Sequence, residues 1–223
     1  MDDFSIKGEI LKDALDKIAH INRLLGGNKV TLEGVKLLTK NLHAGKTLTI
    51  ADLGCGNGDM LRMLADFGQK RGLKMKLTGI DANDFTINYA RSLSTAYGNI
   101  SYQCSDIFSE HSQENKYDII LCTLTLHHFN DHDIDQLISR ILSEAKIGFV
   151  VNDLHRSSIA YYLFKALCLV LGLNEMSEKD GLISILRGFK KEDLERFSVK
   201  FKFKKYSIKW KWAFRYQWIV KTV

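Results

Sequence analysis

The chain has 223 residues, of which 45% are apolar and 26% are charged, so its composition argues against a disordered, collagen-like or coiled-coil protein. This length allows one α/β domain with a sizeable core, or two small domains. The formal net charge is +6, yet residues 187–223 hold twelve Lys or Arg against three Asp or Glu, so the basic character belongs to the end of the chain.

Four cysteines are spread along the chain without a CxxC pair: Cys55, Cys104, Cys122 and Cys168. This spacing favours neither a zinc site nor a disulfide scaffold, so we expect no metal, reduced thiols and a cytoplasmic protein. The beginning, MDDFSIKGEI, lacks a basic region followed by an apolar run and does not predict a secretory signal. The longest apolar stretch, residues 159–173, contains Lys165 and is shorter than the roughly 20 residues of a membrane span, so no transmembrane segment is expected.

The first part of the chain has a helical pattern. Apolar residues recur at helical spacing from about residue 8 to 25, and Gly26 and Gly27 are expected to end this helix. A second helix is predicted from Val30 to Leu42. We interpret residues 1–45 as an N-terminal helical extension or lid, and residues 46–223 as the main domain.

From residue 47 onward, short β-rich runs alternate with segments of helix length. Strands are predicted over residues 47–53, 75–81, 100–104, 117–123 and 147–152. Helices are predicted over residues 59–70, 85–97, 131–144, 159–173 and 191–197. This alternation predicts right-handed βαβ crossovers and a doubly wound, Rossmann-like α/β fold with helices on both faces of a mostly parallel sheet.

The end of the chain predicts an antiparallel strand pair, over about residues 199–208 and 212–222. In the runs FKFK (201–204) and KWKW (209–212), the period of two would place aromatic side chains on one sheet face and lysines on the other. Exposed lysines protect sheet edges from aggregation, so we interpret the basic residues as solvated strands. A nucleic-acid surface is the alternative, which we disfavour.

A glycine-rich loop follows the first predicted strand, in the sequence DLGCGNGD of residues 52–59. Glycines permit a tight turn and let a ligand lie against bare backbone, while the following helix offers free N–H groups. The spacing is GxGxG rather than the GxGxxG expected for a dinucleotide. The preceding Asp52 disfavours a nearby pyrophosphate and suits a cationic or amino-bearing ligand.

Two further acids follow the next two strands. Asp81 ends the second strand, where a carboxylate can accept both hydroxyl protons of a ribose. Asp106 follows the third strand and could accept from an adenine amino group, with Ile107 beside the ring. Each acid alone could be a helix cap or turn residue, but three acids after three successive strands are hard to explain as caps.

The segments ADLGCGNGD, GID, SDIF and YDIILCTLTLHHF together resemble the class I S-adenosylmethionine-dependent methyltransferases, over roughly residues 47–220. The resemblance implies a seven-stranded sheet with an antiparallel last strand, S-adenosyl-L-methionine as donor and S-adenosyl-L-homocysteine as product. It implies that the methionine part of the donor is held by Asp52, Gly54, Cys55 and Gly56, the ribose by Asp81, and the adenine by Asp106 with Ile107. Ala82 and Thr123 are also expected at the cofactor site.

The segment after the fourth strand contains the residues that we expect to face the methyl acceptor. Amino-group methyltransferases of this class often carry an Asn/Asp-Pro-Pro-aromatic motif there, but this chain has no proline and has His127, His128 and Phe129 instead. Histidine has an unperturbed pKa near neutrality, so we expect His128 or His127 to take a proton from a phenol, a hydroxyl or an activated carbon. Either ring could instead only pack against the following helix.

The segment after the fifth strand offers a second candidate base, His155. Its neighbour Arg156 could neutralise a substrate phenolate or carboxylate. Alternatively, this is a helix start, with Asp153 or Ser157 as the cap and Arg156 as a surface charge. The apolar helix that follows is either buried, which we favour, or lines an apolar acceptor pocket.

Two further segments, NRLLGG (22–27) and LISILRGF (182–189), resemble a bacterial subgroup of small-molecule methyltransferases, some of them associated with aromatic polyketide or quinone-type products. In that subgroup the N-terminal helices would form a lid, and Arg23 would pair with the carboxylate of the donor. Otherwise Arg23 is an ordinary cation at a helix C-terminus.

The sequence thus predicts an enzyme that transfers a methyl group from S-adenosylmethionine to a small apolar acceptor, at an aromatic or polyketide-type hydroxyl. Three alternatives stay open. One is C-methylation of a quinone precursor, another is methylation of RNA or protein held by the basic strands, and the third is a donor-binding protein without catalysis. The sequence indicates no oligomeric state.

Overall fold

The computed structural model describes residues 7–40, 46–108, 116–173 and 175–222. Within these ranges the strands form a seven-stranded sheet in the order β3-β2-β1-β4-β5-β7-β6. Neighbouring strands among β1 to β5 pair in parallel, whereas β7 pairs antiparallel with both β5 and β6. The predicted Rossmann-like fold, with a mostly parallel sheet and an antiparallel last strand, is therefore confirmed.

The strands are β1 (Leu48–Leu53), β2 (Met75–Asp81), β3 (Ile100–Cys104), β4 (Tyr117–Thr123), β5 (Ala145–Leu154), β6 (Tyr206–Lys211) and β7 (Arg215–Lys221). The α-helices are α1 (Glu9–Leu24), α2 (Gly27–Thr39), α3 (Asp59–Arg71), α4 (Asp84–Leu93), α5 (Asp131–Glu144), α6 (Ser158–Leu171), α7 (Glu175–Arg187) and α8 (Lys191–Lys200). A short 3₁₀ helix, η1 (Leu126–His128), follows β4. Residues 41–45, which include the predicted end of the second helix, lie outside the described residues.

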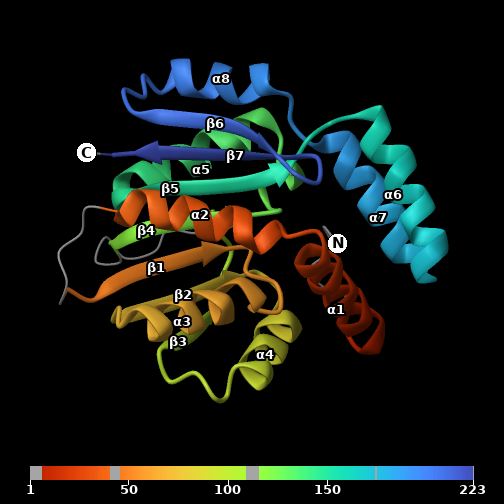
Figure 1. Cartoon of the computed structure of the whole chain (residues 1–223), viewed down its shortest axis with the longest axis horizontal. Helices are drawn as coiled ribbons and strands as arrows, with labels where there is room; N and C mark the ends of the chain where they lie inside the picture. The colour runs from red at the N-terminus through yellow and green to blue at the C-terminus, as the bar shows by residue number, and fades with distance from the viewer. Residues whose placement is uncertain (1–6, 41–45, 109–115, 174, 223) are drawn as a thin grey trace.

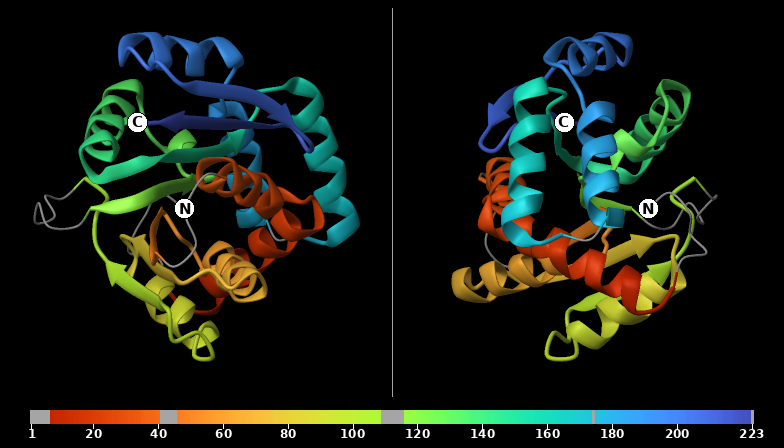
Figure 2. Two further views of the ribbon diagram at one scale, coloured as in Figure 1. Left: turned by 60° about the vertical axis from the view of Figure 1, so that its left-hand side comes forward. Right: turned by 90° about the vertical axis from the view of Figure 1, so that its right-hand side faces the viewer.

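The sheet is buried on both faces, as a parallel sheet between two layers of helices requires. In β4, Ile119 and Leu121 point into one core cluster, which contains the apolar faces of α2, α3 and α4. Ile120 and Cys122 point into the other, which contains those of α5 and α8. Because successive side chains of a strand point to opposite faces, a continuous apolar run is what this arrangement needs. Figure 2 shows the helices on the two sides of the sheet.

Three helices lie beyond the carboxyl ends of the parallel strands. In Figure 1, α1, α6 and α7 gather at the end of the sheet to which the arrowheads of β1 and β5 point, and the C-terminus lies at the opposite end. The carboxyl ends of the strands are where open α/β sheets bind their ligands. These helices therefore cover the edge at which the sequence predicts the site.

The structure corrects the predicted strand over residues 199–208. Helix α8 extends to Lys200, and the strand begins only at Tyr206. Phe201 and Phe203 lie in the turn between these elements, and both pack against the core. Their alternation with lysines therefore belongs to a turn that two phenylalanines hold against the core, and not to a strand. The alternating lysines and tryptophans of residues 209–212 do lie in β6 or directly after it. Trp210 and Trp212 are nevertheless both exposed, at 49% and 68%, so the alternation does not bury the aromatic side chains.

The expected burial of the apolar helix is also wrong. Side chains of α6 are largely exposed, among them Tyr162 at 69%, Leu169 at 78% and Val170 at 82%. Gly172, in a left-handed conformation, caps this helix, and the hydroxyl of Ser157 accepts from the Ala160 N–H at its start. In the part of the chain that the structure describes, no helix combines the length and the hydropathy needed to cross a membrane.

Candidate active site

A first cavity of about 430 Å³ opens at the carboxyl ends of β1, β2 and β4. It brings together residues that are predicted separately from three strands and the loops after them. The predicted residues on its wall are Asp52, Gly54, Cys55, Gly56, Asp81, Ala82, Asp106, Ile107, Thr123 and His128. The expectation that these side chains converge at one edge of the sheet therefore agrees with their placement.

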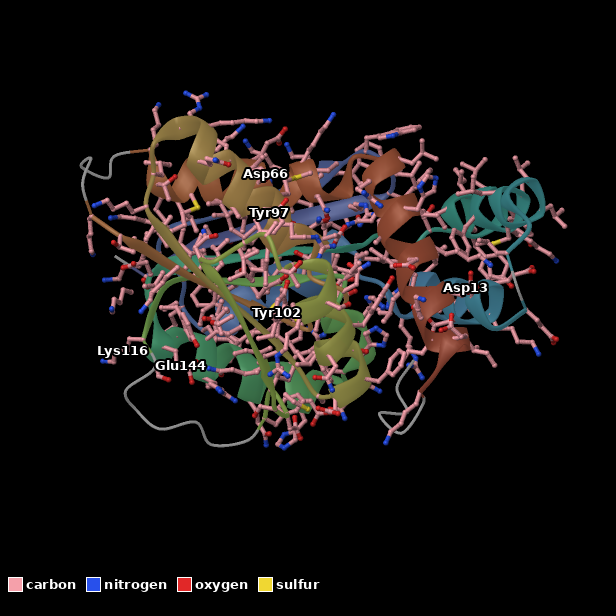
Figure 3. All side chains as sticks on the ribbon, turned by 90° about the horizontal axis from the view of Figure 1, so that it is seen from below. Asp13, Asp66, Tyr97, Tyr102, Lys116 and Glu144 are labelled. Atoms are coloured by element: carbon pink, nitrogen blue, oxygen red, sulfur yellow. The ribbon has the colours of Figure 1, made fainter. Side chains whose placement is uncertain are left out.

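The glycine loop is fixed by its surroundings. Gly54 has a φ of 71°, and a Cβ atom there would lie 2.7 Å from both Oγ1 and Cγ2 of Thr125. Gly58 has a φ of 78°, and a Cβ there would lie 2.0 Å from the hydroxyl of Tyr102, which Figure 3 labels. Both positions combine a left-handed backbone with close neighbours, so side chains are excluded for two independent reasons.

Asp52 is the most unusual group in the first cavity. Its side chain is buried, with only 2% exposed, and its Oδ1 has no hydrogen-bond partner. Burial raises the pKa of this carboxyl well above its usual value, and the nearby Asp59 and Asp81 raise it further. A buried, unpaired oxygen among like charges is costly unless a cation or an N–H donor pairs with it. The arrangement therefore fits an amino-bearing or cationic ligand.

Asp81 is held by the loop itself. Its Oδ2 accepts from the Gly56 N–H at 3.1 Å, and its Oδ1 accepts from the Asn83 N–H at 3.1 Å. Burial raises its pKa, although these backbone hydrogen bonds oppose the shift. Each carboxylate oxygen keeps further acceptor capacity, so this fixed group suits a pair of neighbouring hydroxyls.

The third predicted acid lies at a more open part of the first cavity. Asp106 is exposed, and its Oδ1 accepts from the N–H of Phe108 at 2.9 Å. Ile107 is buried, while Phe108 and Phe129 both line the cavity and pack edge to face with ring centroids 5.0 Å apart. This corner offers apolar surface for a flat ring and a carboxylate for an amino group at its edge.

A second cavity, of about 340 Å³, lies next to the first. Its wall comes from α1, α6, α7, η1 and the turn between β6 and β7. Four side chains line both cavities: Ile18, Asn22, Leu124 and His128. Leu124 has a φ of 56°, which a branched side chain adopts only under backbone strain, and it stands where the cavities meet.

The two adjacent histidines have different surroundings. His127 is buried, and its Nδ1 lies 2.6 Å from Oδ1 of Asp153. Burial alone would raise the pKa of Asp153, but His127 beside it and the hydrogen bonds from His127 and the Leu154 N–H hold that pKa below its usual value. His127 lines only the second cavity, whereas His128 lines both, and the two rings have centroids 4.2 Å apart. His128 is thus the histidine at the junction.

Three predicted site residues lie elsewhere. The Nδ1 of His155 accepts from the indole N–H of Trp210 at 3.3 Å, and burial followed by the charge of Lys190 lowers the His155 pKa. Arg156 pairs with Asp193 at 2.9 Å and is exposed, in agreement with the alternative of a surface charge. Arg23 is exposed near the end of α1. These three side chains line neither cavity.

Two residues of the cavities have no counterpart in the sequence predictions. Asn22 is buried on the shared wall, and its amide donates to Oδ1 of Asn28, whose own amide donates to Asp59 at 2.8 Å. Arg215 is buried on the wall of the second cavity, with 3% exposed. Burial lowers the pKa of Arg215 to about 10, although Asp153 opposes the shift. An arginine directly before the uncharged run of residues 216–220, in a predicted strand, is a sequence signal that could have identified this residue.

Within the described ranges, no group of three or more His, Cys, Asp or Glu side chains is arranged to hold a metal ion. The first cavity instead has a buried acceptor, a fixed carboxylate and an apolar corner. This donor set fits a ligand that combines an amino group, neighbouring hydroxyls and an aromatic ring.

Comparison with known proteins agrees with this reading. Residues 50–148 match the sequence family described as "Methyltransferase domain". A malonyl-[acyl-carrier protein] O-methyltransferase of Acetivibrio thermocellus is 30% identical over 111 residues, which is 49% of this chain and 37% of that protein. The protein-lysine N-methyltransferase EFM4 of Saccharomyces cerevisiae is 35% identical over 98 residues, 41% of each protein. The chain therefore spans less than half the length of these curated relatives.

Solved structures share the fold over most of the chain. The plantazolicin methyltransferase BpumL, in complex with SAH, has a TM-score of 0.70 and 16% identity over 94% of this chain and 90% of its own. The magnesium protoporphyrin IX methyltransferase ChlM of Synechocystis PCC 6803, with bound SAH, has a TM-score of 0.58 and 19% identity over 89% of this chain and 83% of its own. The chain therefore contains a methyltransferase domain, residues 50–148, and has the fold of the class I S-adenosylmethionine-dependent methyltransferases.

Proposed function

We propose that the protein binds S-adenosylmethionine in the first cavity and methylates a hydroxyl of a small, largely apolar acceptor held in the second. The single observation that carries this proposal is the pair of cavities that meet at His128. One cavity has the polar groups that a nucleoside with an amino-acid chain needs, and the other is lined mainly by apolar side chains.

The residues of the first cavity have distinct roles in this proposal. Asp52 faces the amino group of the donor, Asp81 accepts from the ribose hydroxyls, and Asp106 with Ile107 takes the adenine. When bound, the donor supplies an electrophilic methyl group, which passes to the acceptor oxygen while the carbon–sulfur electron pair returns to sulfur. The protein then needs mainly to align the oxygen with that methyl group and to remove the hydroxyl proton.

His128 is the proposed proton acceptor, because it is the titratable side chain on the shared wall of the two cavities. The buried pair of Asp153 and His127 is proposed to position it, since the two imidazole rings lie against each other. His155 is no longer proposed as a base, because it lines neither cavity.

The N-terminal extension is proposed to act as a lid through α1 alone. Ile18 and Asn22 of α1 lie on the shared wall, whereas α2 packs against the sheet as part of the core. C-methylation at an activated carbon would use the same base and the same cavities, so it remains a variant of the proposal. A large RNA or protein substrate is less well supported, since the second cavity is walled by α1, α6, α7 and a hairpin turn.

The test is to incubate the purified protein with methyl-labelled S-adenosylmethionine and a host extract, and to count label in the organic-soluble, nucleic-acid and protein fractions. Label in the organic fraction, absent with an Asp81→Asn variant, supports the proposal and allows the product to be identified by mass. Label confined to RNA or protein would contradict it.

The role of His128 is tested separately. His128→Ala should reduce turnover by a factor of about 100 or more, the usual contribution of a general base, while affinity for S-adenosylhomocysteine stays within threefold. The matched control is His132→Ala, since His132 is exposed on α5 and lines neither cavity. Undiminished turnover in His128→Ala would remove this histidine from the mechanism.

A further inference from the structure

Arg215 is a buried cation on the wall of an apolar cavity. It begins β7, at the turn whose residues Trp212, Ala213 and Phe214 also line the second cavity. Its side chain is 3% exposed, yet Nε and Nη1 have no hydrogen-bond partner. A guanidinium has five N–H donors in a fixed fork, so burying it with two nitrogens unpaired is costly.

The surrounding groups do not supply the missing acceptor. Asp153 is the carboxylate whose charge reaches Arg215, but its oxygens already accept from the Leu126 and Leu154 N–H groups and from His127. A Cβ added at Gly27 would lie 2.9 Å from Cζ of Arg215 and 1.8 Å from Oδ1 of Asn22, so the absence of a side chain at this position leaves room for the guanidinium. The Oδ1 of Asn22 also has no partner.

Two other charged side chains line the second cavity and have different surroundings. Lys17 pairs with Asp13 at 2.8 Å and is partly exposed. Asp180 of α7 brings a negative charge to the wall. A dianion such as a phosphate monoester would be repelled by Asp180, and Arg215 is the one buried cation, among the described residues of this wall, that could neutralise it. A carboxylate carries a single charge and can accept two parallel hydrogen bonds from the guanidinium group.

We infer that the second cavity binds an acceptor that carries a carboxylate as well as the methylated group, and that Arg215 is the partner of that carboxylate. This inference rests on the proposed function, because it assigns the second cavity to the acceptor. The apolar side chains of α6, with Ile185 of α7, then hold the body of the acceptor, while its reacting atom lies at the junction beside His128. Arg215 is a specificity-determining residue, and its loss affects which acceptors bind rather than how the donor binds.

The test compares matched probes that differ only in charge. Binding of 3,4-dihydroxybenzoate and of 3,4-dihydroxybenzamide is measured calorimetrically with S-adenosylhomocysteine at saturation. We expect the acid to bind the wild-type protein at least about tenfold more tightly than the amide, as charge-assisted hydrogen bonds predict. Phenyl phosphate, the third probe, should bind more weakly than the acid.

The matched variants are Arg215→Met and Lys17→Met, each of which removes one cation from the wall of the second cavity. Arg215→Met should abolish the preference for the acid and leave affinity for S-adenosylhomocysteine within threefold, whereas Lys17→Met should keep the preference. If Arg215→Met does not fold, Arg215→Lys keeps the charge but loses the fork, and should retain only part of the preference.

Each contrary outcome overturns the inference. Equal binding of acid and amide by the wild-type protein, binding of neither, or a preference that survives in Arg215→Met would show that Arg215 holds no acceptor carboxylate. A fall of more than tenfold in affinity for S-adenosylhomocysteine, with the preference intact, would assign the guanidinium to the carboxylate of the donor. Failure of the proposed function is distinguishable, because then the wild-type protein would either not bind S-adenosylhomocysteine or would transfer label only to RNA or protein.

Discussion

The first and second cavities share four side chains but are built in different ways. Apart from the residues of α1, the first is lined by residues that lie at the ends of β1, β2, β3 and β4 or shortly after them, so short segments of sequence specify most of it. The second collects side chains from α1, α6, α7 and the β6–β7 turn, which are far apart in the chain. Under the proposed function, donor binding is therefore encoded in local motifs, and acceptor selection in the packing of distant elements. Substitutions in α6 or α7 can change the acceptor without disturbing the donor site.

The largest effect is expected from Asp153→Ala, which removes the buried partner of His127 on the wall of the second cavity. Asp153 is 1% exposed and accepts hydrogen bonds from Leu126 at 2.8 Å, from His127 Nδ1 at 2.6 Å and from Leu154 at 2.7 Å. Removing one partner of such a buried pair costs about 3–5 kcal/mol of stability. Urea unfolding measures this loss.

The control for Asp153→Ala is Asp131→Ala, which breaks the exposed ion pair with Arg196. It should cost no more than about 1 kcal/mol. Similar losses in the two variants would mean that the Asp153–His127 pair does not stabilise the junction.

Asp81→Asn should damage the first cavity alone. An amide has one acceptor oxygen and brings an N–H group toward a backbone donor, Gly56 or Asn83, so both the loop and the ribose contact suffer. Hydrogen bonds to charged groups contribute about 1.5–3 kcal/mol each, so affinity for S-adenosylhomocysteine should fall about 100-fold. Calorimetric titration measures this, with Asp84→Asn on the exposed start of α4 as control. Unchanged affinity in Asp81→Asn would refute the ribose assignment.

Asp52→Asn should give effects of opposite sign on stability and on binding. Burial raises the pKa of Asp52 above its unfolded value, so the folded protein holds a proton that the unfolded chain has lost. The stability of the ligand-free protein therefore falls as the pH rises from the pKa of Asp52 in the unfolded chain to its higher pKa in the folded protein, and it is greatest below this interval. Replacing the carboxyl by an amide should remove this slope and stabilise the free protein by about 1 kcal/mol at pH 7, while donor affinity falls about tenfold.

Urea unfolding between pH 5 and pH 8, without ligand, measures the change that Asp52→Asn brings. A loss of stability at pH 7 would indicate that the Asp52 carboxylate is already satisfied in the free protein.

The smallest effects are expected at His155 and Arg156, outside both cavities. His155→Ala and Arg156→Ala should leave turnover within about twofold, since exposed or surface-paired side chains contribute little. A methyl-transfer assay with the acceptor that the labelling experiment identifies measures this. A large loss in either variant would mean that the acceptor extends beyond the second cavity toward α8.

The sequence predicted the core of the fold well because buried parallel strands and the glycine loop have strong local signals. The bounds of β2, β3, β4 and α5 agree with the predictions, and the predicted cofactor residues other than Arg23 line one cavity. The strand predicted from residue 199 was wrong, because Phe201 and Phe203 anchor a turn at a spacing that also fits a strand. The periodicity of two residues does not separate these cases.

The acceptor side could not be predicted to the same extent. The burial expected for residues 159–173 failed because hydropathy does not tell whether a neighbouring element covers a helix, and α6 packs mainly against α7. Arg215 and Asn22 belong to different ends of the chain, and only the antiparallel pairing of β7 with β5 brings Arg215 beside the start of α2. No local sequence pattern predicts that these two residues are close in space.

The position of α1 makes the two binding events interdependent. Ile18 and Asn22 line both cavities, so a ligand that orders α1 from one side lowers the entropy that must be lost when the other ligand binds. Donor and acceptor are then heterotropic effectors of each other, and the factor by which one tightens the other must be the same in both directions.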